Sequence, residues 1–194
     1  MPLTTLDPNT ALIVIDLQKG IVSGNFIHPI GDVIDRTRAL IDVFRAKNLP
    51  VVLVNVAGRA PGRTEQGPRN ITSFSEGWTD LLPQLDQQPG DIVVTKRSWG
   101  AFATTDLKHQ LKARGVTQVV VTGVATSVGV EATARQAYEQ GFNVTLALDA
   151  MTDICEEAHE YSVRNVFPRV GETGPTKEVI SLLEKLLEER NSAS

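Results

Sequence analysis

Three residues of this chain could together carry out acid–base chemistry: Asp16, Lys96 and Gly129. Asp16 ends one apolar run, Lys96 follows another, and Gly129 lies in the small-residue turn after a third. A carboxyl group can give or take a proton, and a neighbouring ammonium group stabilises negative charge. The amino end of a helix, expected at Gly129, offers backbone N–H groups to a developing anion. A nucleophilic side chain would suit this position, yet glycine has none.

The protonation state of Asp16 depends on two opposing effects. A nearby Lys96 ammonium favours the carboxylate and lowers the pKa of Asp16, whereas burial at a strand end raises that pKa. A general acid must be protonated before it reacts. Both outcomes remain open from the sequence.

Short apolar runs separated by helical patterns must position these residues. Five clear runs lie at 11–16, 51–56, 91–95, 119–122 and 144–148, with a weaker sixth at 165–167. The helical patterns lie at 33–44, about 104–114, 128–140, 155–164 and 175–190. Apolar strands without polar alternation, separated by helices, predict a parallel sheet covered on both faces. Ligands bind outside the carboxyl ends of such strands, so we expect a site there.

Composition narrows the class of protein. The chain has 194 residues, a net charge of −4 and one cysteine, Cys155. These values predict a single cytoplasmic domain with neither a nucleic-acid partner nor a membrane partner. No signal peptide is visible at the amino end.

Three motifs carry a resemblance to a known family: residues 11–18, 95–107 and 123–134. With these motifs the chain resembles the isochorismatase-like hydrolase superfamily, which includes nicotinamidases and other cysteine hydrolases. The resemblance implies one domain over residues 1–194. It also implies a three-layer α/β/α fold whose six-stranded parallel sheet has the order 3-2-1-4-5-6, and a homo-oligomer, either a dimer or a tetramer.

The same resemblance implies roles for the residues of the site. Asp16 and Lys96 match the catalytic aspartate and lysine, and Gly129 matches the position of the nucleophilic cysteine. A cis peptide is implied between Val124 and Ala125. With glycine at position 129, the chain also resembles a bacterial subgroup of this superfamily that has glycine at the same position and no assigned substrate.

Gly129 leaves three hypotheses about function. In the first, Asp16 is the general acid in the hydrolysis of a small acidic metabolite, and a vinyl ether of the isochorismate type, which would release pyruvate, is one candidate substrate. In the second, the protein hydrolyses an amide by means of activated water or Cys155; the segment 125–135 is more similar to the cysteine hydrolases. In the third, it binds a small molecule without catalysis. Retention of Asp16 and Lys96 speaks against the third.

We expect neither a catalytic metal nor a cofactor. Nicotinamidases of this superfamily bind a metal through an Asp-x-His element and a second histidine, but the matching segment here is 55–59, without histidine. The three histidines of the chain, His28, His109 and His159, are expected to have structural or surface roles.

A long loop at 58–77, rich in glycine, proline and arginine, is predicted to contribute to substrate binding. Its arginines, which include Arg69, could bind a carboxylate through two hydrogen bonds. The residues expected around the substrate are Gln18, Arg59, Arg63, Trp99, Phe102, Val124, Ala125, Ser127 and Val128.

Overall fold

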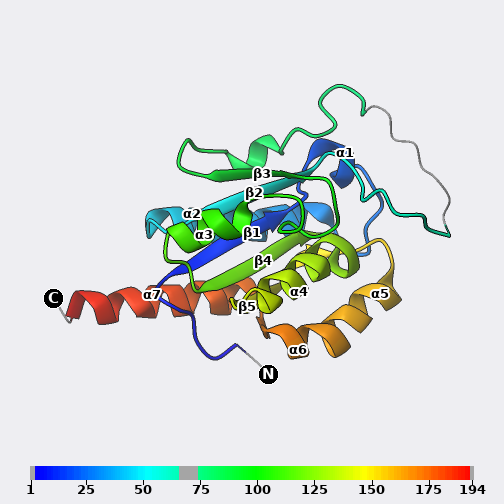
Figure 1. The fold of residues 1–194 in the computed structure, drawn as a ribbon. Helices are drawn as coiled ribbons and strands as arrows, with labels where there is room; N and C mark the ends of the chain where they lie inside the picture. Colours follow the sequence, from blue (N-terminus) through cyan, green and yellow to red (C-terminus); the bar gives the residue numbers. More distant parts are fainter. Residues whose placement is uncertain (1–2, 66–73, 193–194) are drawn as a thin grey trace.

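A central sheet of six parallel strands organises the molecule (Figure 1). The computed structural model describes residues 3–65 and 74–192, with side chains up to residue 186. The strands are β1 (Thr10–Ile15), β2 (Val51–Val56), β3 (Ile92–Lys96), β4 (Gln118–Val124), β5 (Asn143–Thr152) and β6 (Glu172–Gly174). Their order is β3-β2-β1-β4-β5-β6, and every neighbouring pair is parallel. The predicted order 3-2-1-4-5-6 is therefore confirmed.

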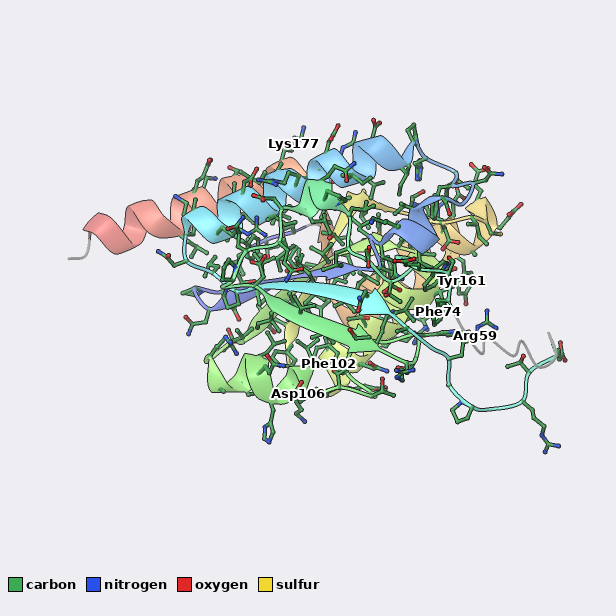
Figure 2. All side chains as sticks on the ribbon, turned by 90° about the horizontal axis from the view of Figure 1, so that it is seen from above. Arg59, Phe74, Phe102, Asp106, Tyr161 and Lys177 are labelled. Carbon is green, nitrogen blue, oxygen red and sulfur yellow. The ribbon has the colours of Figure 1, made fainter. Side chains whose placement is uncertain are left out.

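Helices cover both faces of this sheet. The α-helices are α1 (Lys19–Val22), α2 (Ile30–Ala46), α3 (Leu107–Ala113), α4 (Glu131–Glu139), α5 (Glu156–Tyr161), α6 (Phe167–Val170) and α7 (Thr176–Ser192). A 3-10 turn, η1 (Pro83–Leu85), and two π-helical turns, η2 (Thr126–Val130) and η3 (Ser162–Val166), complete the set. Figure 2 shows α2 and α7 on one side of the sheet and α3 on the other.

Strand β1 is buried along its whole length and contributes side chains to two hydrophobic cores. Ile13 and Ile15 pack in the core with α3, α4 and α6, whereas Leu12 and Val14 pack in the core with α2 and α7. Successive side chains of a strand point to opposite faces, so a strand between two helical layers needs apolar residues at every position. This requirement explains the unbroken apolar run. Among the described residues, no helix is long and apolar enough to cross a membrane.

The predicted sixth strand at 165–167 is wrong. That segment is helical, within η3 and α6, and the edge strand is the short β6 that follows it. Val166, Phe167 and Val170 are buried at helical spacing, and Pro168 lies at the start of α6, where a helix does not need its N–H group. The three residues of β6 have no apolar run that could mark them as a strand.

Candidate active site

A buried ion pair lies at the carboxyl ends of β1 and β3. Lys96 Nζ is 2.8 Å from Asp16 Oδ2, and the two side chains are 1% and 9% exposed. The Lys96 ammonium also donates a hydrogen bond to the carbonyl oxygen of Trp99. Strand β2 lies between β1 and β3, so the long lysine side chain spans one strand to reach the carboxylate. The structure thus brings together the two ionisable residues that the strand ends indicated.

Burial decides the protonation of Asp16. It raises the pKa of the Asp16 carboxyl to about 6, against the opposing effect of the Lys96 ammonium. The second oxygen, Oδ1, is buried and has no hydrogen-bond partner among the residues that the structure describes. Asp16 also lines a cavity. One carboxyl oxygen is therefore neutralised by lysine, while the other is available to a proton or a ligand.

The backbone at Asp16 is unusual for a residue with a side chain. Its φ angle is +52°, in the left-handed region, which costs a non-glycine residue on the order of 1 kcal/mol and is common at functional sites. The neighbouring strand approaches closely here: a Cβ atom on Gly123, whose φ is +110°, would lie 2.1 Å from the Ile15 carbonyl oxygen. Glycine at 123 thus lets β4 bring the following turn against the end of β1.

Gly129 lies directly beside the ion pair. A Cβ atom at this position would be 2.9 Å from Ile15 Cγ2, 3.1 Å from Lys96 Nζ and 3.2 Å from Asp16 Oδ2. These distances are shorter than almost all real Cβ contacts. The ammonium and the carboxylate therefore occupy part of the space that a side chain at 129 would need.

The turn that carries Gly129 is fixed by several hydrogen bonds. The peptide between Val124 and Ala125 is cis, as the resemblance implied. The Ala125 carbonyl oxygen accepts hydrogen bonds from the N–H groups of Val128 and Val130. The Ser127 N–H donates to Asp153 Oδ2 at 2.7 Å. Asp153 was missed in the sequence, although it follows the end of β5, where a carboxylate can reach the same edge.

The cavity next to the ion pair has a volume of about 460 Å³ and mostly apolar walls. Phe74 and Trp78 stack with their ring centroids 4.2 Å apart and form part of one wall. Trp99 also lines the cavity while 66% exposed, which places it at the mouth. Sequence reasoning missed Phe74 and Trp78, because they lie in an irregular loop without periodicity.

The predicted substrate-binding residues divide into two groups. The residues that line the cavity are Arg59, Trp99, Val124, Ala125 and Val128, together with Asp16, Lys96 and Gly129. In Figure 2, Arg59 and Phe74 lie at the same end of the molecule, whereas Phe102 lies beside α3. Substrate contact by the first group remains a prediction.

The second group lies away from the cavity wall. The Gln18 side-chain amide is fully buried and bonds to both the N–H and the carbonyl oxygen of Val56 and to the Trp78 carbonyl oxygen, so it ties three segments together. Phe102 packs in the core against Phe142. Ser127 contributes its N–H to Asp153.

The loop arginines are distributed unevenly around this cavity. Arg59 lines it, whereas Arg63 is exposed and outside its wall. Arg69 lies outside the described residues.

The residues of the segment 55–59, where the resemblance would place a metal-binding element, do not suit a metal ion. Asn55 donates its side-chain amide to the Thr79 carbonyl oxygen at 2.8 Å, and no histidine follows in the segment 55–59. Within the described part of the chain, no group of three His, Cys, Asp or Glu residues could hold a metal ion.

Cys155 lies outside the described cavity wall. Its side chain is exposed, and the Sγ–H group donates to Glu157 Oε2 at 3.3 Å. This geometry gives no support to Cys155 as a substitute nucleophile.

A second hollow, of about 480 Å³, lies at the amino ends of β4 and β5, far from the ion pair. The buried amide of Gln118 there bonds to the Asp7 N–H and to the Thr145 hydroxyl. The Gln118 amide is therefore engaged within the fold.

The sheet order and the buried acid–lysine pair define a candidate site at the carboxyl edge of a parallel α/β fold. Residues 10–178 match the model of the Isochorismatase domain. The chain is 40% identical over 177 residues to the isochorismatase family protein YwoC from Bacillus subtilis, covering 88% of this chain and 92% of YwoC. It is 31% identical over 171 residues to Nicotinamidase 3 from Arabidopsis thaliana, covering 82% of this chain and 83% of that protein. An isochorismatase family protein from Burkholderia thailandensis superposes with a TM-score of 0.88 and 40% identity, over 93% of this chain and 98% of the other. The chain therefore belongs to the isochorismatase family and is a hydrolase.

Proposed function

We propose that this hydrolase acts on a small acidic metabolite by general acid catalysis at Asp16, and that its reaction is the hydrolysis of a vinyl ether with release of pyruvate. The observation that carries the proposal is the Asp16 carboxyl itself. Its pKa is raised to about 6 by burial, and its Oδ1 has no partner among the described residues, although the side chain lines the cavity. A carboxyl group in this state can donate a proton near neutral pH.

The proposed reaction needs an acid and water rather than a nucleophilic side chain. The Asp16 carboxyl transfers its proton to the methylene carbon of the enolpyruvyl group, and the adjacent carbon becomes an oxocarbenium ion. Water adds to that carbon and returns a proton to the Asp16 carboxylate. The resulting hemiketal collapses by breaking the bond between this carbon and the ether oxygen. The hemiketal hydroxyl loses its proton and becomes the ketone of pyruvate, while the departing ether oxygen gains a proton and leaves as an alcohol.

Lys96 supports this cycle by its position. Its ammonium, 2.8 Å from Asp16 Oδ2, stabilises the carboxylate that forms after the proton is transferred. Arg59, in the cavity wall, is the residue we assign to a carboxylate of the substrate. The remaining wall is mainly apolar, which suits the carbon frame of a small metabolite.

A second candidate reaction is the hydrolysis of an amide, favoured by the 31% identity to a nicotinamidase. With Gly129 in place of a nucleophile, this reaction would require the Asp16 carboxylate to act as a general base on water. Proton donation and proton removal require opposite protonation states of Asp16, so the pH dependence of turnover separates the two reactions.

The test is pyruvate release from isochorismate, with nicotinamide hydrolysis measured in parallel. We expect kcat/KM for isochorismate to fall as pH rises through about 6, the pKa of Asp16 in the free protein. The Asp16→Asn variant should lose activity by about 100-fold or more, because a carboxamide cannot donate the proton. Asp106→Asn, at an exposed position beside α3, is the matched control and should retain full activity.

Two results would overturn the proposal. One is unchanged pyruvate release in Asp16→Asn. The other is ammonia release from nicotinamide that rises through about pH 6 while isochorismate stays intact; this result would establish the amide reaction instead.

A further inference from the structure

A cluster of polar side chains lies behind the turn that carries Gly129. His159, from α5, places Nδ1 2.9 Å from the Thr126 hydroxyl in η2. Asp153, after β5, accepts the Ser127 N–H through Oδ2 and the Ile154 N–H through Oδ1. Two consecutive residues of the turn are therefore held by side chains from a different part of the chain.

The burial of these groups makes their contacts specific. Thr126 is fully buried and Asp153 is 1% exposed. A buried polar group without a partner costs about 1–3 kcal/mol, so neither contact is readily exchanged for water. His159 is half-buried, and its ring meets the His28 ring edge-on, with the centroids 5.1 Å apart.

His28 extends the cluster to the loop before α2. Its N–H and its Nδ1 both contact the Thr152 hydroxyl, at 3.2 and 3.1 Å. Ile27, next to it, donates its N–H to the Asp153 carbonyl oxygen. The loop, the end of β5, α5 and η2 thus form one connected polar network.

We propose that His159 is a positioning residue, which acts through the Thr126 hydroxyl to hold the cavity wall formed by Val124, Ala125, Val128 and Gly129. Asp153 holds the same wall through the Ser127 N–H. Thr126 directly follows Ala125, and Val128 and Gly129 follow two and three residues later, so a shift of Thr126 must move the wall against Asp16. The role in turnover rests on the proposed hydrolase function, whereas the structural role does not.

The surroundings of His159 favour a neutral ring. Burial lowers the pKa of His159, and His28 lowers it further; Asp153 and Glu160 act in the opposite direction. A neutral imidazole can pair with a hydroxyl either as donor or as acceptor, which suits a single bond to Thr126.

Hydrogen exchange measured by mass spectrometry on the intact protein tests the proposal without any substrate. We expect peptides that cover 124–130 to exchange about fivefold faster in His159→Leu, the factor that corresponds to one ordinary hydrogen bond. His159→Asn places an amide atom where Nδ1 lies and should restore slow exchange. His109→Leu, at an exposed histidine in α3, is the matched control and should leave 124–130 unchanged.

Thr126→Val removes the same hydrogen bond from the other side at nearly constant volume, so it provides the test if His159→Leu does not fold. It should accelerate exchange to the same extent, and the double variant should exchange no faster than either single variant. Unchanged exchange in Thr126→Val, or equally fast exchange in His159→Asn and His159→Leu, would overturn the proposal.

Turnover gives the second readout. If the protein hydrolyses isochorismate, we expect His159→Leu to lower kcat about tenfold or more, with recovery in His159→Asn and no change in His109→Leu. A loss confined to KM would contradict positioning against Asp16. Failure of the hydrolase assay in the unmodified protein would reject the proposed function and leave the exchange result as the test of His159.

Discussion

Gly129 lies where related hydrolases are expected to carry their nucleophile, and its surroundings explain why the position is more than an empty space. The Lys96 ammonium and the Asp16 carboxylate lie 3.1 and 3.2 Å from the place of a Cβ atom. A side chain there must displace one of them or the Ile15 methyl group. The glycine is therefore coupled to the geometry of the acid.

This coupling predicts the effect of Gly129→Ala. The methyl group should push Lys96 away from Asp16, weaken the buried ion pair and reduce the stability of the protein by about 1–3 kcal/mol. Urea denaturation measures that change. Gly31→Ala is the matched control, because a Cβ atom at 31 would meet nothing within 4 Å and alanine favours the helix α2. Equal stabilities of Gly129→Ala and Gly31→Ala would show that the ion pair tolerates a side chain.

The residues of the site differ in how well the sequence predicts their place in it. Asp16 and Lys96 follow from the rule that polar residues at the ends of parallel strands meet at one edge. Phe74 and Trp78 do not, because Phe74 lies within the predicted loop 58–77 and Trp78 directly after it, where the sequence has no periodicity from which a direction could be inferred. Gln18 shows the opposite case: its neighbour Asp16 suggests a site, yet its amide is used to join β1, β2 and the Trp78 segment.

Among the elements, α1 and the segment 74–80 form one wall of the cavity through a close contact. A Cβ atom on Gly20 would lie 2.1 Å from the Trp78 ring, and the Gly20 N–H donates to the Trp78 carbonyl oxygen at 2.9 Å. Only glycine allows the indole to lie against the helix at this distance.

We therefore expect Gly20→Ala to displace Trp78 from the wall and to raise KM about tenfold or more for whichever substrate the hydrolase assay identifies, with a smaller effect on kcat. Steady-state kinetics measure both constants. Gly24→Ala, in the same stretch of cavity wall, is the control, because a Cβ atom there would have its nearest contact at an ordinary 3.4 Å. A KM for Gly20→Ala equal to that of Gly24→Ala would show that the indole position does not affect binding.

Elements with strong apolar patterns are predictable from the sequence, and short ones are not. β1, β2, β4 and β5 are largely buried strands, and their apolar runs predict them. β6 has three residues and pairs on one side only, so pairing with β5 decides its conformation. The segment before it has apolar residues that suit a strand or a helix, and packing against the sheet selects the helix.

At the scale of the whole molecule, the buried ion pair links stability to pH. The folded protein binds the Asp16 proton more tightly than the unfolded chain does. The pKa of Asp16 is about 6 in the folded protein, against the ordinary value of 3.8 for an aspartate in an unfolded chain. The stabilisation from this proton is complete below about pH 3.8 and is lost as pH rises through about 6. His159 contributes the opposite trend, because folding lowers its pKa. Its contribution to stability increases as the pH rises towards 6.5, the ordinary pKa of a histidine.

Subtracting the free energy of unfolding of the unmodified protein from that of a variant separates these two trends. Asp16→Asn removes the titration of Asp16 and leaves that of His159 in place, so the stability of the variant minus that of the unmodified protein should rise between pH 4 and pH 7. The expected rise is on the order of 3 kcal/mol, the value of a pKa shift of about 2. The effect of the Lys96 ammonium is already contained in the pKa of about 6. Leaving this ammonium without its carboxylate therefore displaces the whole difference curve downward without changing the rise. Urea denaturation at each pH gives the curve. A difference that falls with pH would mean that Lys96 dominates and that Asp16 is ionised throughout, which would also remove the basis for a general acid in this site.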